Sequence, residues 1–181
     1  MSPSYNRVLE FWFEELSPSD WWRKNEQLDA RIREEFSAVH ESVSEGATED
    51  WRRNDRGRLA EIIVLDQFSR NMFRNQARAF GYDALAREKA REAVAAGVLE
   101  RLEENQRSFV LMPFMHSEEM EDHRLVLPLF QQYCSDNTVE FEKRHAAIIE
   151  RFARYPHRNA VLGRESSAEE LEFLAQPGSS F

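Results

Sequence analysis

The spacing of apolar residues along this chain leaves room for helices and for little else. Over residues 28–43, apolar side chains recur every three or four positions, at Leu28, Ile32, Phe36, Val39 and Val43. This spacing is the period of an amphipathic helix, and it continues for more than four turns. No stretch of the sequence alternates convincingly between apolar and polar residues, as a strand with one buried face does. The pattern therefore predicts an all-α fold.

The same reading, with capping residues and helix breakers added, predicts about seven helices packed as antiparallel pairs. The expected helices are one ending near residue 15, one from residue 28 to Gly46, residues 58–70, residues 82–96 before Gly97, one starting at Ser117, residues 139–154, and a short one starting at Ser167. Residues 99–112 are less regular. We expect Pro113 to end that segment and Pro128 to kink or split the helix that starts at Ser117.

Length and composition predict a single cytoplasmic domain covering residues 1–181, with a loose tail from about residue 176. A chain of 181 residues is long enough to bury a core without disulfides. The single cysteine, Cys134, excludes an internal disulfide and fits a reducing compartment. The sequence has no signal-peptide pattern, and its apolar runs are far shorter than the ~20 residues that span a bilayer. We expect neither a membrane partner nor a cofactor.

The charge pattern excludes one class of partner and favours another. A net charge of -9 argues against nucleic acid as a partner. Arginine nevertheless outnumbers lysine by 21 to 3, and basic residues outnumber acidic ones over residues 66–91 and 141–164. A coding bias towards arginine would explain the total but not this clustering. Because a guanidinium matches the oxygens of carboxylates and phosphates, the clusters favour a small anionic molecule as ligand.

Four segments stand out from the apolar pattern: LDQFSRNMFR (65–74), PFMHSEEM (113–120), HAAIIERF (145–152) and ARYPHRNAVLGR (153–164). With these segments the sequence resembles domain-of-unknown-function family 924, whose members are mostly bacterial, and the resemblance extends over nearly the whole chain. It implies a tetratricopeptide-like helical fold but no established reaction. The residues that match the family's motifs are Asp66, Gln67, Arg70, Arg74, His116, Ser117, Glu118, Pro156, His157, Arg158 and Asn159.

Two of these residues are candidate catalytic groups. His116 directly precedes an expected helix start, where a neutral imidazole is favoured and can act as a base, and Glu118 follows closely. The plainer interpretation is a histidine that only caps the helix. The candidate ligand-binding residues are Asp66, Gln67, Arg70, Arg74, His145, Arg154, His157, Arg158, Asn159 and Arg164. Each also has a structural interpretation: Asp66 and Arg70 form an i, i+4 pair, and His145 shares a face with Phe141, Ile149 and Phe152.

No motif identifies a metal site, a nucleotide-binding loop or a serine nucleophile. Two functions from different classes remain. In the first, the four segments meet in one pocket faced by Arg70, His116, His145 and Arg158, which binds a small anion and is catalytic if His116 and Glu118 act as base and acid. We expect an anion there because the arginines outnumber the nearby acids. In the second, the chain is a tetratricopeptide-like module that grips a peptide or protein.

Overall fold

The computed structural model describes residues 4–181, and every regular element in that range is helical, which confirms the predicted all-α class. The helices are α1 (Tyr5–Glu10), α2 (Glu26–Ser44), α3 (Asp55–Ile63), α4 (Ser69–Met72), α5 (Asp83–Ala95), α6 (Glu104–Met115), α7 (Met120–Tyr133), α8 (Asp136–Phe152) and α9 (Ala168–Leu174). Single π-helical turns follow α1 (Phe11–Glu15) and join α3 to α4 (Val64–Phe68). Short 3-10 turns lie at Glu49–Arg53, Ala77–Phe80, Val98–Glu100 and Pro156–Arg158.

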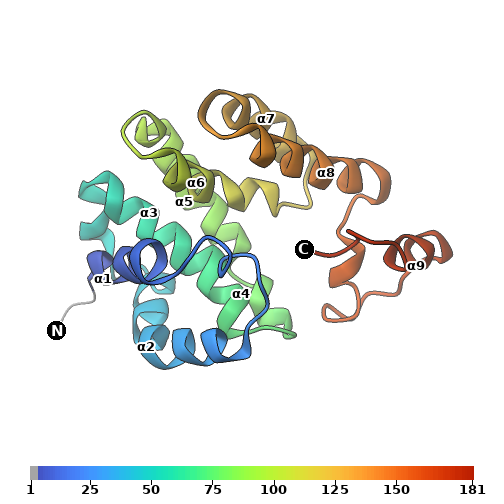
Figure 1. Ribbon diagram of the computed structural model, residues 1–181, viewed down its shortest axis with the longest axis horizontal. Coiled ribbons are helices and arrows are strands. Elements are labelled where there is room, and N and C mark those ends of the chain that lie inside the picture. Colours follow the sequence, from blue (N-terminus) through green and yellow to red (C-terminus); the bar gives the residue numbers. More distant parts are fainter. Residues whose placement is uncertain (1–3) are drawn as a thin grey trace.

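Neighbouring helices pack in sequence order along the second half of the chain (Figure 1). Helix α5 packs against α6, α6 against α7, and α7 against α8, with connections short enough to reverse the chain each time. Helix α3 lies between α1, α5 and α6. Helix α9 lies beyond the end of α8, where its Phe173 packs on Phe152, and it contacts the Pro156–Arg158 turn. Within residues 4–181, no helix combines the length and apolar character that crossing a membrane requires. The tetratricopeptide-like arrangement of the pairs stays a prediction.

Capping side chains place several of the helix starts. Asn25 accepts hydrogen bonds from two backbone N–H groups in the first turn of α2, and Asn54 accepts one from Gly57 in α3. Ser135 caps α8. Ser167 and Glu170 form a reciprocal capping box at α9, as the sequence predicts. These bonds satisfy N–H groups that a helix start leaves without intrahelical partners.

The prediction for Pro113 is wrong, because this residue lies inside α6 and does not end it; Pro128 lies inside α7 and does not split it, while the expected kink stays a prediction. A proline in a helix interior costs roughly 3 kcal/mol. In α6 this cost is offset by burial of nearly every side chain from Phe109 to Met115. Burial on all sides also removes the amphipathic pattern, which is why residues 99–112 look irregular in the sequence. Ser117 does not cap α7, which begins at Met120; its hydroxyl accepts a hydrogen bond from the Glu119 N–H instead.

The buried apolar residues form two clusters. The larger runs through α1 to α7 and the start of α8. The smaller joins Ile148, Ile149 and Tyr155 to partly buried side chains of α7, α8 and α9. The segment predicted to be a loose tail folds back between these parts: the Ser179 hydroxyl donates to the Leu174 carbonyl, and the Phe181 ring packs on His145 at 3.8 Å between centroids.

Gly57 provides a test of the packing at the start of α3. A Cβ atom at this position would lie 1.9 Å from the backbone oxygen of Trp51, which the 3-10 turn holds in place. We expect Gly57→Ala to lower the free energy of unfolding by about 1–3 kcal/mol, because backbone must move to admit the methyl group. Chemical denaturation measures the loss. Gly81→Ala is the control, since its nearest atom would lie 3.4 Å away; equal stability of the two variants would contradict this packing.

Candidate functional site

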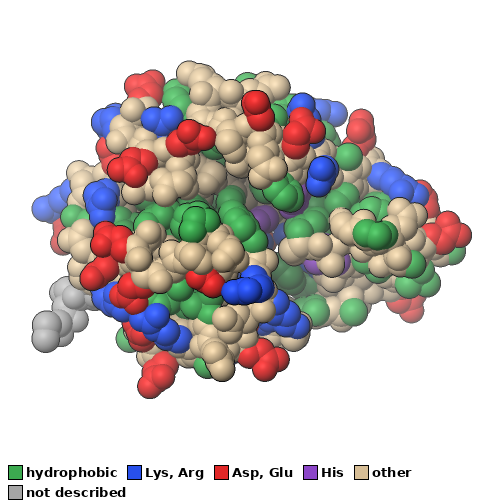
Figure 2. All heavy atoms as spheres, in the orientation of Figure 1, with side chains coloured by type: hydrophobic (Ala, Val, Ile, Leu, Met, Phe, Trp, Pro, Cys, Tyr) green, Lys and Arg blue, Asp and Glu red, His purple; other side chains and the backbone are tan. Residues whose placement is uncertain are grey.

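A large cavity lies between residues 21–24, the segment 67–80 that includes α4, the helices α6 and α8, and the Pro156–Arg158 turn. Its volume is about 1210 Å³. Figure 2 shows the molecule hollowed near its centre, with histidine side chains visible inside the hollow. The polar and charged residues that line it include Arg23, Lys24, Gln67, Arg70, Asn71, Arg74, His116, His145, His157 and Arg158. The four segments singled out in the sequence therefore all reach one concavity, except that from 145–152 only His145 lines it.

The π-helical turn Val64–Phe68 places a buried carboxylate behind His116. The wider turn carries Asp66, whose Oδ1 lies 2.7 Å from Nδ1 of His116 at the end of α6. The amide of Gln67 donates to the other carboxylate oxygen at 2.6 Å. Burial opposes ionisation of Asp66, but His116 and Arg70 outweigh it and hold the pKa of this carboxyl below its usual range. A carboxylate only accepts hydrogen bonds, so His116 donates its Nδ1–H to Asp66.

Arg70 and Arg158 share a second buried carboxylate, Asp83 at the start of α5. Arg70 donates to both Asp83 oxygens, at 2.9 and 3.1 Å, and its Nη1 also lies 3.1 Å from Asp66. Nη1 of Arg158 lies 3.5 Å from Asp83, and Nη2 donates to the His116 backbone carbonyl at 2.9 Å. The Arg158 guanidinium sits over Phe80 and Tyr155 at 4.5 and 4.7 Å from the ring centres. Among the described residues, nothing accepts a hydrogen bond from its buried Nε.

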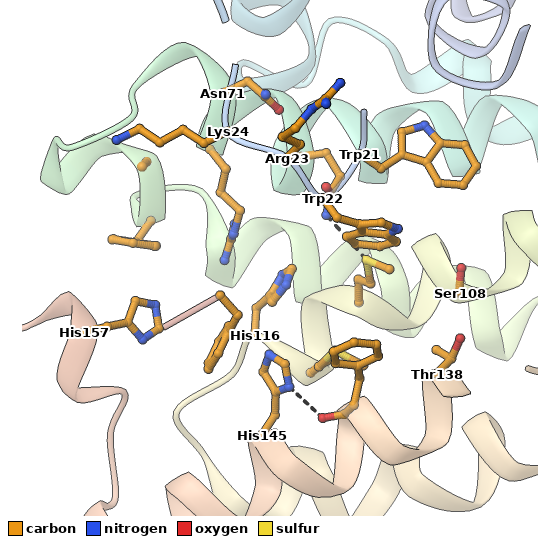
Figure 3. A pocket seen from close by; sticks show the side chains of 18 of the residues that line it. Trp21, Trp22, Arg23, Lys24, Asn71, Ser108, His116, Thr138, His145 and His157 are labelled. Carbon is orange, nitrogen blue, oxygen red and sulfur yellow. Dashed lines mark hydrogen bonds between the residues drawn. The ribbon is translucent and has the colours of Figure 1, made fainter. Parts of the chain in front are cut away.

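Burial keeps the pocket histidines uncharged. It lowers the pKa of His116 below the ordinary 6.5, with Asp66 opposing and Arg70 adding to this effect. It lowers the pKa of His145 to about 3, and that of His157, where Arg158 contributes, to about 4. Burial and Arg70 also lower the pKa of Arg158 to about 10. The rings of His116 and His145 lie close together on the cavity wall (Figure 3), with their centroids 6.4 Å apart and their planes inclined at 54°.

The structure separates the predicted site residues into two groups. The residues that line the cavity are Gln67, Arg70, Arg74, His116, His145, His157 and Arg158, with Asp66 directly behind His116. The residues outside its lining are Glu118, Arg154, Asn159 and Arg164. The second group forms its own hydrogen-bond network. Arg164 donates to both carboxylate oxygens of Glu118, and Arg154 donates to both of Glu170. The Asn159 side chain accepts from Arg164 and donates to Glu170. This network ties the segment around the Pro156–Arg158 turn to the connection between α6 and α7 and to α9, and it leaves Glu118 outside the lining of the cavity.

The prediction that the arginines lack acidic partners is wrong for most of these side chains. Asp29 of α2 pairs with Arg74 at 2.8 Å, while Glu170 and Glu118 neutralise Arg154 and Arg164. Such pairs join residues up to 46 positions apart, and nothing in the local sequence indicates them. Arg158 differs from the others, since it shares Asp83 with the more closely bound Arg70.

Sequence reasoning missed several residues of this site. Asp83 carries no signal beyond its place in the first turn of an expected helix. The aromatic and apolar wall was also missed, and it comprises Trp21, Trp22, Phe80, Met112, Met115, Phe141 and Phe181. Among residues 4–181, no group of three or more His, Cys, Asp and Glu side chains has the arrangement of a metal site. The pocket thus combines an arginine whose charge is incompletely matched, neutral imidazoles and an apolar wall.

Comparisons with known proteins agree with this fold. A family profile described as "Bacterial protein of unknown function (DUF924)" matches residues 8–178. No curated protein matches the sequence. Among solved structures, the chain is similar to a protein of unknown function from Agrobacterium tumefaciens, with 31% sequence identity and a TM-score of 0.89. The similarity covers 94% of this chain and 96% of that one. The resemblance seen in the sequence is confirmed.

Removing Asp83 tests whether the two arginines depend on it. We expect Asp83→Ala to lower the free energy of unfolding by about 3–5 kcal/mol, because two buried guanidinium groups lose their shared carboxylate. Urea denaturation of this variant and of a control variant measures the change in the free energy of unfolding. Asp50→Ala is the control, since the Asp50–Arg53 pair is exposed and such pairs contribute about 0–1 kcal/mol. A loss at Asp83 no larger than at Asp50 would contradict the shared-carboxylate arrangement.

The lowered pKa of His145 predicts an acid-dependent loss of stability. Below pH 6.5 the unfolded chain binds a proton at this histidine, whereas the folded chain does not until about pH 3. Stability from the neutral ring is therefore complete above pH 6.5 and lost as the pH falls towards 3. Between pH 7 and pH 5 we expect His145→Gln to lose about 1–2 kcal/mol less unfolding free energy than the unchanged protein. Identical pH profiles would contradict a buried neutral ring.

Proposed function

The chain belongs to the DUF924 family of bacterial proteins of unknown function, and from this premise we propose that it binds a small anionic molecule in the central cavity. Arg158 is the anchor. Its side chain is 5% exposed, its buried Nε has no acceptor among the described residues, and its nearest carboxylate oxygen lies 3.5 Å away on an acid that Arg70 already engages. Because Asp83 is shared with Arg70, the Arg158 guanidinium keeps capacity for a carboxylate or phosphate oxygen that enters the cavity, and such charge-assisted hydrogen bonds are stronger than those between neutral groups.

The wall of the cavity favours a ligand with an apolar body attached to the anionic group. Phe80 lies under Arg158, and Phe181 packs between His145 and His157. Trp22 and Phe141 line the cavity while remaining substantially exposed. Ligand pockets commonly combine such apolar walls with a few fixed polar groups. A carboxylate or phosphate carrying an aromatic or aliphatic portion matches both features.

His116 gives the pocket a group that can accept a proton. Because Asp66 fixes the Nδ1–H, the neutral ring presents the lone pair of Nε2, the arrangement that orients a general base. Glu118 was the expected acid partner, but its carboxylate engages Arg164 and the Tyr155 N–H. In a catalytic version of this proposal, Asp66 therefore takes the orienting role beside His116. We propose a cytoplasmic location on the basis of the single cysteine.

A peptide-binding module is the second candidate, and the size of the cavity favours it. A volume of about 1210 Å³ exceeds the ~300–1,000 Å³ of typical small-molecule pockets. For this candidate we propose that the antiparallel helix pairs form a concave binding surface of the kind that tetratricopeptide repeat proteins use. The two candidates differ in their anchor: a peptide held across the groove depends on several rim contacts, whereas a small anion depends on Arg158.

Thermal melts with inorganic phosphate test the anion proposal. At a phosphate concentration of ~10 Kd, binding adds about 1.4 kcal/mol of stability, which raises Tm by roughly 3–6 °C in a chain of this size. We expect this rise in the unchanged protein, relative to chloride of equal ionic strength. We expect Arg158→Gln to abolish it, because the anchor is removed.

The matched control is Arg53→Gln, since Arg53 is exposed and lies outside the pocket lining. It should keep the full phosphate response. An equal rise with chloride, or an undiminished rise in Arg158→Gln, would contradict the small-anion function. Loss of the response in both variants would indicate that phosphate acts on net charge instead of in the pocket.

A further inference from the structure

The two facing imidazoles of the cavity have fixed hydrogen-bonding roles. Nδ1 of His116 meets the Asp66 carboxylate at 2.7 Å, and Nδ1 of His145 meets the Phe141 backbone carbonyl at 2.7 Å. Both partners only accept hydrogen bonds, so both Nδ1 atoms carry the proton. A neutral imidazole has one donor and one acceptor, and therefore each Nε2 carries a lone pair. Neither Nε2 makes a hydrogen bond with a described residue.

Among the described residues, no group on the cavity wall donates a hydrogen bond to either of these lone pairs. The Arg158 Nη2 donates to the backbone carbonyl of His116 and not to its ring. Arg70 directs its Nη1 and Nη2 atoms to Asp83 and Asp66. Asp66 contributes only oxygen acceptors, while the Phe181 ring covers His145 without any donor. The cavity thus offers cationic donors at Arg158 and, beside it, two acceptors from neutral histidines.

We propose that the anionic ligand also carries a hydroxyl group, whose single O–H donates to the Nε2 of His116 or of His145 while its carboxylate or phosphate binds Arg158. This inference rests on the proposed anion site and specifies the class of molecule that fills it. The hydrogen bond from Arg158 to the backbone carbonyl of His116 holds the guanidinium and the histidine next to each other. A ligand whose hydroxyl is close to its anionic group can therefore bind the arginine and the histidine at the same time. A hydroxy acid with an apolar body fits this pattern.

The same two lone pairs could face a metal ion, and the surroundings argue against that occupant. Metal-bound histidines do often donate their second N–H to a carboxylate or carbonyl, as these two do. Here, however, the guanidinium of Arg158 contacts the backbone of His116, and Arg70 lies beside Asp66. Two fixed positive charges repel a cation, and the described residues supply no third ligand group. A neutral protic group matches the site better.

Two acids that differ by one hydroxyl test the inference: 3-phenyllactate and 3-phenylpropionate, titrated calorimetrically in the presence of EDTA. Glycerol 3-phosphate and propyl phosphate form a second pair for a phosphate-bearing ligand. We expect the hydroxylated member of at least one pair to bind at least about tenfold tighter, since a site built around a hydroxyl leaves its polar groups unpaired with the analogue. His116→Phe or His145→Phe, whichever removes the ring nitrogen that accepts the hydroxyl, should reduce this preference.

Each outcome decides the matter. Equal affinities within both pairs, or a preference unchanged in both histidine variants, would overturn the inference while phosphate binding through Arg158 still stands. Binding of none of the four compounds would also overturn it. A preference that appears only after Zn²⁺ is added back would assign the lone pairs to a metal instead. If a histidine variant fails to fold, the comparison within the pairs on the unchanged protein decides alone. Loss of phosphate binding itself would remove the proposed function as well.

Discussion

A buried ionic group made of two arginines and two aspartates holds this fold together where its parts meet. Asp66 belongs to the π-helical turn before α4, Asp83 begins α5, and Arg158 lies in the turn before α9. Arg70 contacts both aspartates, and Asp83 contacts both arginines. Isolated charges could not remain at such depth, so the helices must stay registered to keep each charge paired. The cavity and its histidines owe their positions to this register.

The same ionic group explains why charge and hydrogen-bond donors are unevenly distributed along the pocket wall. Arg70 satisfies most of the capacity of Asp83, which leaves Arg158 with a longer contact and one donor without an acceptor. Burial, in turn, keeps His116 and His145 neutral, so the wall beside Arg158 accepts hydrogen bonds at their free ring nitrogens. A ligand complementary to this surface is anionic at one end and carries a hydrogen-bond donor beside it. Stability thus depends on the pairing of these four charged groups, and recognition depends on the incomplete pairing of Arg158.

The sequence predicted the parts of the structure that depend on local pattern. The period of Leu28 to Val43 located α2, and the Ser167 cap located α9. It failed at Pro113, where burial on all sides of α6 outweighs the helix-breaking tendency of proline. For the site, motif residues such as His116 and Arg158 indeed share one cavity, but Glu118 and Arg164 pair with each other outside its lining. Which acid pairs with which arginine depends on contacts between distant residues, so the role of Asp83 could not be derived from spacing.

A crystal structure of the protein grown or soaked in millimolar phosphate tests the central claim most directly. The account predicts a phosphate oxygen within hydrogen-bonding distance of the Arg158 guanidinium, with Arg70 still donating to both Asp83 oxygens and the Nδ1 of His116 still donating to Asp66. Phosphate found only at exposed arginines, with Arg158 turned to pair fully with Asp83, would contradict the claim that this arginine is the anchor of a binding site.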